Sequence, residues 1–303
     1  MMAENVLCQQ SFRGYVLSIL SLCKVKISFF AVLSAVSGLF LASFPSKTVL
    51  AALATGVFLM ASGAGALNHC QEWRTDALMS RTAGRPIPGG RIKPGSALIL
   101  SMFLMSSGCA ILILTGNPAA PLLGFAAVFW YNGFYTWFKT CNKLAAIPGA
   151  LVGAIPPAIG WMAGGGHIFD LRLAALCFFF FTWQVLHFFI HVLACGKEYE
   201  NAGLPSASMI FTEGQLNRLT FQWLLAAVMA TQFIVLFELI HSPWTHAAIL
   251  AGSLWLALEG VSFIKRQQNG YAGLFGKTNS YMLFVLLLLI LDGLFRFPGW
   301  QVF

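Results

Sequence analysis

Residues 172–195 read RLAALCFFFFTWQVLHFFIHVLAC, and their only charged side chain, Arg172, stands at the start. An α-helix needs about 20 mostly apolar residues to cross a hydrocarbon core about 30 Å thick, so this stretch is long enough to span a membrane. No water is available in that core, and backbone polar groups must be satisfied within the segment. A run of this length therefore predicts a helix and not a barrel strand.

The rest of the chain has the same character. Of its 303 residues, 58% are hydrophobic and 9% are charged, whereas soluble domains carry about 25% charged residues. This composition excludes a disordered, a collagen-like or a disulfide-rich secreted protein, and it leaves a polytopic helical membrane protein. The seven cysteines are scattered without a CxxC pair, and we interpret most of them as small buried apolar residues.

Eight further apolar runs are separated by turn residues, as in Phe44-Pro45-Ser46. We predict an all-α polytopic membrane fold in which residues 1–26 form an N-terminal cytoplasmic segment and residues 27–297 form a single domain. Its nine transmembrane helices are expected at about 27–44, 48–67, 96–115, 118–138, 144–164, 172–195, 216–240, 244–264 and 279–297.

The basic residues predict an orientation. With nine crossings, fifteen of the 18 lysines and arginines fall on the side of the N-terminus, and the other three are Lys47, Arg172 and Arg296. Positive residues are enriched in cytoplasmic loops, so we place the N-terminus in the cytoplasm. The first 14 residues include Glu4 and Arg13 and fit neither a secretory signal nor an arginine-rich mitochondrial transit peptide. We therefore expect a multi-pass protein of a bacterial inner membrane.

Two long polar loops, at about 68–95 and 196–215, lie on the predicted cytoplasmic side. In the first, Asn68, Glu72 and Asp76 recur every four residues, which places them on one stripe if the second span continues as a helix. Such oxygen ligands suit Mg²⁺, which is usually held by one or two carboxylates and by substrate phosphates. A solvated helix end with local ion pairs is the alternative interpretation of the spacing.

Three arginines follow in the same loop, at Arg81, Arg85 and Arg91. Arginine forks bind phosphate oxygens in a bidentate manner, so the stripe and the arginines together suit a metal-chelated diphosphate. The second loop contributes Glu198 and Glu200, which could hold a second metal across a cavity. Taken alone, each loop fits ordinary cytoplasmic structure better, and it is their pairing on one side that favours a site.

Two further groups combine polar and aromatic residues. Tyr135 and Lys139 share a helix face, where Lys139 is either a diphosphate contact or a lysine that reaches the membrane interface. His187 and His191 share a face of the span that contains Trp183 and could bind a metal or haem iron. The alternative is a pair of buried histidines that bond to neighbouring helices.

These motifs, in this order, resemble the UbiA-type intramembrane prenyltransferases over about residues 20–295. Within that family the chain looks most like the branch that farnesylates protohaem IX. The matching blocks are the Asn68, Glu72 and Asp76 stripe with RTAGRPIPGGR (81–91), YTWFK (135–139), GAIPPAIGW (153–161), TWQVLHF (182–188), EYENAGLP (198–205) and KTNSY (277–281). Glu72 and Glu198 stand where the family commonly has Asp, and Leu186 replaces the usual proline.

The resemblance implies a nine-helix bundle and a magnesium-dependent transferase. Mg²⁺ would be held by Asn68, Glu72, Asp76 and Glu198, while Arg81, Arg85 and Lys139 would neutralise the leaving diphosphate of farnesyl diphosphate. The acceptor would be haem b, a substrate and not a cofactor. Further substrate contacts are expected at Tyr135, Trp183, His187, His191 and Tyr199. The implied partners are the lipid bilayer and, in assembly, a haem A synthase or terminal oxidase, with no nucleic acid.

Two alternatives stay open. A member of the same family could use an aromatic quinone precursor as acceptor, although the block around His187 favours haem. A transporter or a non-catalytic haem-binding protein belongs to another class. A transporter would place its polar sites near the membrane midplane, and a non-catalytic relative should lose the Asn68, Glu72 and Asp76 stripe.

Overall fold

The computed structural model describes residues 12–266 and 271–296, and every regular element in these ranges is helical. The elements are α1 Phe12–Leu22, α2 Val25–Ala42, α3 Lys47–Asp76, α4 Pro94–Ile113, α5 Ala119–Val128, the π-helix η1 Phe129–Tyr135, α6 Thr136–Phe138, α7 Ala146–Gly149, α8 Leu151–Ala163, α9 Leu171–Asn201, the 3₁₀ helix η2 Ala207–Met209, α10 Glu213–Leu236, α11 Pro243–Arg266 and α12 Tyr271–Arg296.

Eight helical segments of the described chain are long and apolar enough to cross a membrane. They correspond to eight of the nine predicted spans, so a multi-pass membrane protein is confirmed. The remaining span, predicted at 118–138, is divided into α5, η1 and α6, which follow one another without a break from 119 to 138. The count of nine spans and the orientation of the N-terminus stay predictions.

Two predicted loops begin later than the sequence indicated. The helix α3 continues to Asp76 and α9 continues to Asn201, so residues 68–76 and 196–201 are helical and not loop. The end of α9 is a Schellman motif in which Gly203 has a φ of +72° and Leu204 N donates to Tyr199 O at 2.9 Å. Because the glycine turns the chain only there, Glu198 and Tyr199 stay on the helix.

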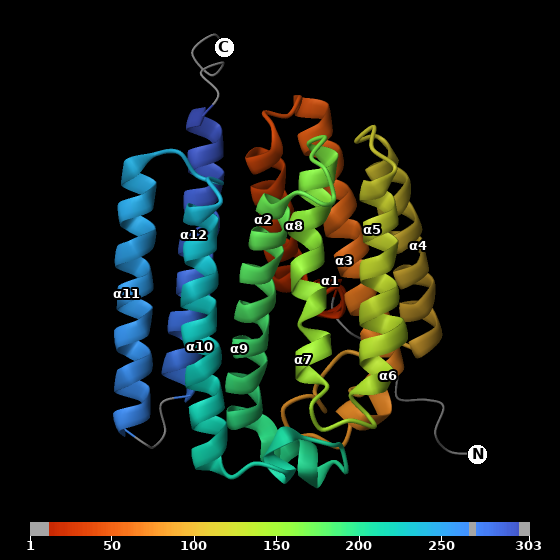
Figure 1. Ribbon diagram of the computed structural model, residues 1–303. Coiled ribbons are helices and arrows are strands. Elements are labelled where there is room, and N and C mark those ends of the chain that lie inside the picture. Colours follow the sequence, from red (N-terminus) through yellow and green to blue (C-terminus); the bar gives the residue numbers. More distant parts are fainter. Residues whose placement is uncertain (1–11, 267–270, 297–303) are drawn as a thin grey trace, which may run out of the picture.

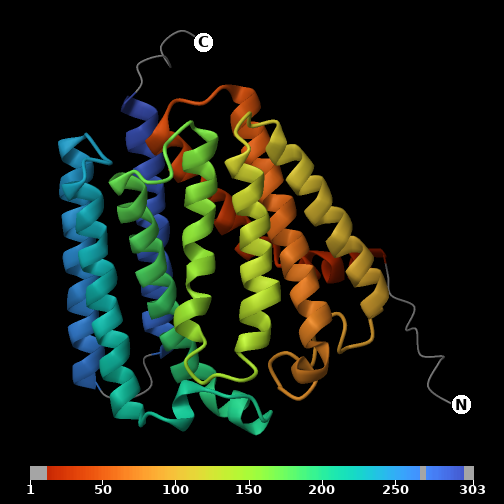
Figure 2. The ribbon, with the colours of Figure 1, turned by 45° about the vertical axis from the view of Figure 1, so that its right-hand side comes forward.

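The connections differ at the two ends of the bundle. The links between α3 and α4, between α6 and α7 and between α9 and α10 lie together at one end (Figure 1). The shorter links, such as residues 43–46 between α2 and α3, lie at the other end. The helix α1, within the N-terminal segment, runs across the direction of the long helices (Figure 2). The fold therefore gathers the motif-bearing connections at a single end.

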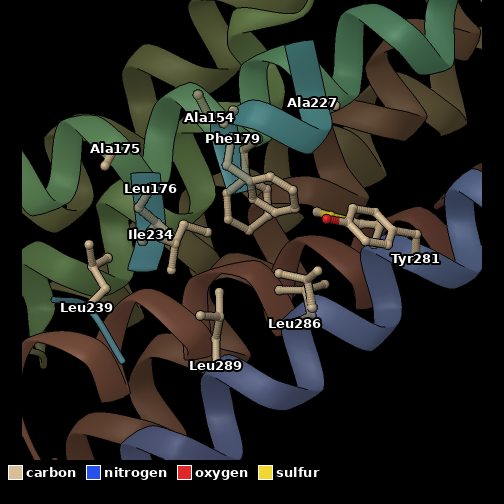
Figure 3. Close-up of a cluster of buried hydrophobic side chains, with 14 of the residues drawn as sticks. Ala154, Ala175, Leu176, Phe179, Ala227, Ile234, Leu239, Tyr281, Leu286 and Leu289 are labelled. Carbon is tan, nitrogen blue, oxygen red and sulfur yellow. The ribbon is translucent and has the colours of Figure 1, made fainter. Parts of the chain in front are cut away.

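A large hydrophobic core joins the second half of the bundle. Phe179 of α9, Ile234 of α10 and Leu286 of α12 are fully buried in it (Figure 3). Tyr281 is also buried, and its hydroxyl donates to Thr231 Oγ1 at 2.8 Å and lies 2.9 Å from Ser253 Oγ. Its polar atom is thus satisfied inside an apolar region, as buried hydroxyl groups require.

The helices α2 and α8 pack backbone against backbone. A Cβ atom added at Gly160 would overlap the carbonyl oxygen of Ala35, and one added at Gly38 would overlap that of Pro157. The obstacles are backbone atoms, which cannot rotate away as a flexible side chain can. These two glycines therefore set the distance between the helices.

We expect Gly160→Ala to lower the free energy of unfolding by about 2 kcal/mol, because overpacking forces a backbone shift. Gly95→Ala is the matched control, since its added methyl group would meet no atom within 4 Å. Thermal unfolding in detergent should show a lower midpoint for Gly160→Ala only. Equal midpoints for the two variants would contradict this account of the α2–α8 contact.

Candidate active site

The last turns of α3 carry the predicted stripe. Asn68, Glu72 and Asp76 lie four residues apart on a continuous helix, as the spacing required. Asn68 and Asp76 are buried. Asn68 Nδ2 donates to Glu72 Oε1 and, at 3.2 Å, to Thr136 Oγ1. The stripe therefore faces the protein interior, and the solvated helix end is the wrong interpretation.

Lys139 reaches the stripe from beyond α6. Its Nζ lies 2.6 Å from Glu72 Oε1 and 5.8 Å from the centre of the Tyr135 ring. A lysine that only extended to the membrane interface would not make this ion pair. The structure thus brings together Tyr135, Lys139 and the acidic stripe, which the sequence had indicated separately.

Lys24 is a site residue that sequence reasoning missed. It precedes α2 in a left-handed conformation with a φ of +47°, and its Nζ donates to Asn68 Oδ1 at 2.6 Å and to Tyr131 OH at 3.1 Å. Burial lowers the pKa of Lys24 to about 8, although the negative charge of Glu72 acts to raise it. Below that pH the ammonium group is protonated and supplies a further positive charge beside the stripe.

Asp76 and Arg85 form a forked ion pair. Arg85 Nη1 lies 2.8 Å from Asp76 Oδ1 and 2.7 Å from Asp76 Oδ2. Thr82 Oγ1 donates to the carbonyl oxygen of Asp76 at 2.8 Å, so the same residue fixes the loop in two ways. Arg91, also expected to bind phosphate, instead donates to Gly84 O within the loop.

Glu198 connects α9 to the α3–α4 loop. Its Oε1 accepts from Ser80 Oγ at 2.6 Å, and its Oε2 lies 3.5 Å from Arg81 Nε. That Oε2 is buried and accepts no hydrogen bond from the part of the chain that the structure describes. Glu198 therefore keeps an acceptor available at the edge of the site.

The π-helix η1 orients the side chains of Tyr131 and Thr136. Asn132 Nδ2 donates to Ala64 O at 3.0 Å, and Gln71 Nε2 donates to Asn132 O at 2.9 Å. Thr136 Oγ1 donates to Tyr131 O at 2.9 Å, a carbonyl group of the wider helix. Short π-helical segments occur frequently at functional sites. Here the contacts with α3 hold Tyr131 and Thr136 against Asn68.

An aromatic region continues from this point along α9. The ring of Tyr135 stacks with Tyr131 at 6.2 Å and with Phe188 at 5.8 Å between centres. His187 lies 5.1 Å from the Trp183 ring and 4.6 Å from that of Phe275.

The two histidines have different neighbours. The ring of His191 lies 6.3 Å from that of Tyr199, on the same helix. His187 Nδ1 instead lies 3.2 Å from Asn279 Oδ1 of α12. Although both histidines are on one helix face, they do not share a set of partners.

The oxygen donors of the site fit a magnesium ion. In the described ranges no three His, Cys, Asp or Glu side chains converge into a ligand group, and each acid of the site faces a base. Asn68 Oδ1, the carboxylates of Glu72 and Asp76, and the buried Glu198 Oε2 are nevertheless all hard oxygen ligands. Mg²⁺ is usually held by one or two carboxylates while substrate phosphates complete its coordination, so these donors are of the kind it uses.

We expect Arg85→Ala to destabilise the protein by about 3 kcal/mol, because it leaves the carboxylate of Asp76 buried without a partner. The side chain of Asp76 is 2% exposed, whereas those of Arg81 and Glu198 are 37% and 33% exposed. Arg81→Ala should therefore change the stability by less than about 1 kcal/mol. Thermal unfolding in detergent compares them, and equal losses would contradict the difference in burial.

Comparisons with known proteins identify the family. The UbiA prenyltransferase family matches residues 31–291. A protoheme IX farnesyltransferase from Oleidesulfovibrio alaskensis is 30% identical over 275 residues, which cover 90% of this chain and 95% of the relative. Another, from Opitutus terrae, is 32% identical over 279 residues, which cover 91% and 94%.

Solved structures share the fold. A digeranylgeranylglyceryl phosphate synthase aligns with a TM-score of 0.74 at 14% identity and covers 92% of this chain and 98% of its own. A UbiA homolog from Archaeoglobus fulgidus bound to GPP and Mg²⁺ aligns with a TM-score of 0.63 at 12% identity, covering 90% and 99%. The sequence match and the fold agree, and this chain belongs to the UbiA prenyltransferase family.

Proposed function

We propose that this protein transfers a farnesyl group from farnesyl diphosphate to a vinyl group of haem b. The bond from farnesyl C1 to the diphosphate oxygen breaks, and a new bond joins C1 to the vinyl carbon. Water then adds to the resulting cation and loses a proton, which gives the hydroxyethylfarnesyl chain of haem O. The protein would cross a bacterial inner membrane nine times, with its N-terminus and its site on the cytoplasmic side. A haem A synthase or a terminal oxidase would be its assembly partner.

One observation carries the proposal: carboxylates and bases lie paired around Asn68 at the end of an apolar bundle. Glu72 faces Lys139, Asp76 faces Arg85 and Glu198 faces Arg81. A diphosphate chelated by Mg²⁺ presents negative oxygens for the bases and a cation for the acids. Each group can therefore exchange its present partner for one of opposite charge in the ligand, and none is left buried and unpaired.

Bound Mg²⁺ would supply positive charge to the diphosphate oxygens as the leaving group departs. Lys139, Arg85 and Arg81 bind the same oxygens, and positioned cations that meet developing charge are a large catalytic contribution. The bond from Asn68 Nδ2 to Thr136 Oγ1 would hold the amide in place while its Oδ1 faces the metal.

The aromatic region then receives the allylic cation and the acceptor. Ring faces attract cations within about 6 Å, and the stacked Tyr131, Tyr135 and Phe188 line the way from Lys139 towards His187. His187, with Trp183 beside it, would orient the haem. The names of the relatives support haem as acceptor, and a quinone precursor is the second candidate within the family.

The purified protein in detergent, supplied with haem b, farnesyl diphosphate and Mg²⁺, should form haem O that is detectable by chromatography and mass spectrometry. Chelation of the metal should stop the reaction. Prenylation of 4-hydroxybenzoate in place of haem would overturn the proposed acceptor but leave the diphosphate chemistry intact.

Glu72→Gln should lower kcat about 100-fold or more, because it keeps the size of the side chain and removes a charge that binds metal. The control is Glu238→Gln, an exposed acid between α10 and α11 at the opposite end of the bundle. Steady-state rates should fall only in the first variant. Full activity of Glu72→Gln would exclude its carboxylate from the metal site.

His187→Ala should raise the KM for haem at least tenfold and leave the KM for farnesyl diphosphate nearly unchanged, since the Glu72–Lys139 pair lies on other elements. The two constants are measured by varying each substrate at saturation of the other. A parallel loss in both would show that His187 has a structural role.

A further inference from the structure

His187 has a polar partner on another helix. Its Nδ1 lies 3.2 Å from Oδ1 of Asn279, which is 92 residues away in the sequence. Because an amide oxygen only accepts hydrogen bonds, this contact is a hydrogen bond when the ring carries its proton on Nδ1. The lone pair of a neutral imidazole is then on Nε2, the atom on the far side of the ring from Asn279.

The ring is held by apolar neighbours on its other sides. The ring of Trp183, one turn before His187 on α9, lies 5.1 Å from the centre of the His187 ring. The ring of Phe275, one turn before Asn279 on α12, lies 4.6 Å from it. The indole N–H of Trp183 donates to Thr278 O at 3.1 Å, and Phe275 has no donor, so neither neighbour satisfies Nε2. Asn279 therefore supplies the one directional contact that distinguishes the two ring nitrogens.

The position of His187 connects this contact to the reaction. Lys139 Nζ lies 5.8 Å from the centre of the Tyr135 ring, which stacks with Phe188 at 5.8 Å. The ring of Phe188 lies 6.2 Å from that of His187. An aromatic path thus leads from Lys139 to His187, whose Nε2 is satisfied by none of these neighbours. A free imidazole nitrogen beside aromatic rings suits the iron of a planar, apolar macrocycle.

We infer that Asn279 is a positioning residue for the acceptor: it fixes the tautomer and the ring orientation of His187 so that Nε2 binds the haem iron. This inference rests on the proposed function. Histidines that bind metals commonly donate their other N–H to an oxygen, and loss of that partner typically weakens metal binding 10- to 100-fold. The contact makes α12 part of the acceptor site, together with α9.

The test titrates the purified protein with ferric haem b, without farnesyl diphosphate, and records the absorption and electron paramagnetic resonance spectra. The wild type should show histidine ligation that His187→Ala removes. Asn279→Ala should weaken haem binding 10- to 100-fold and lose the ligation signature, whereas Asn279→Asp, which also accepts, should retain it. Ser280→Ala, a neighbouring exposed residue on α12, is the matched control.

Three outcomes would overturn the inference. The first is an unchanged haem affinity and spectrum in Asn279→Ala. If His187→Ala still lost haem binding in that case, the proposed function would stand without the inference. Loss of haem binding in Asn279→Ala together with a lower thermal midpoint and a higher KM for farnesyl diphosphate would show a structural role. Absence of haem binding to the wild type would overturn both this inference and the proposed function.

Discussion

The site depends on the cost of a carboxylate buried away from water. Such a charge is tolerated only beside an opposite charge or several hydrogen-bond donors, and each acid that the site uses meets this condition. Asp76 is held by Arg85, nine residues later, so the α3–α4 loop must fold back over the end of α3. Glu72 is held by Lys139, so the end of α6 must lie against α3. The arrangement of elements at this end of the bundle follows from these pairs.

The same pairs account for how an anionic substrate could enter an apolar bundle. Three acids face three bases, and Lys24 adds one more positive charge beside Asn68. In the proposed complex the incoming metal and diphosphate separate these partners and bind to both. The charges were desolvated when the chain folded, so substrate binding exchanges one set of close partners for another and does not bury new charges of the protein.

The sequence predicted what depends on local spacing. The four-residue repeat of Asn68, Glu72 and Asp76, the lengths of the apolar runs and the Tyr135–Lys139 face all follow from helix geometry. What depends on distant contacts could not be predicted in this way. Lys24 joins the site through partners 44 and 107 residues away, and the π-helix forms where Gln71 and Asn132 meet across two helices. In the α3–α4 loop, the sequence offered Arg81, Arg85 and Arg91 as equal candidates for binding phosphate. Only the folded structure showed that Arg91 donates to Gly84 O within the loop.

The two histidines of α9 show how tertiary structure divides residues that a pattern treats alike. His187 and His191 are one turn apart and share a face, so periodicity alone predicts a common ligand. The neighbouring elements differ, however: α12 offers Asn279 to the first, whereas the second lies beside Tyr199 of its own helix. Asn279 offers His187 an oxygen acceptor for Nδ1, and a proton on that nitrogen leaves the lone pair of the ring on Nε2. A defined lone pair is what a metal requires, and in the proposed reaction His187 would therefore face the acceptor, whereas the diphosphate would lie beside Lys139 and the stripe on α3.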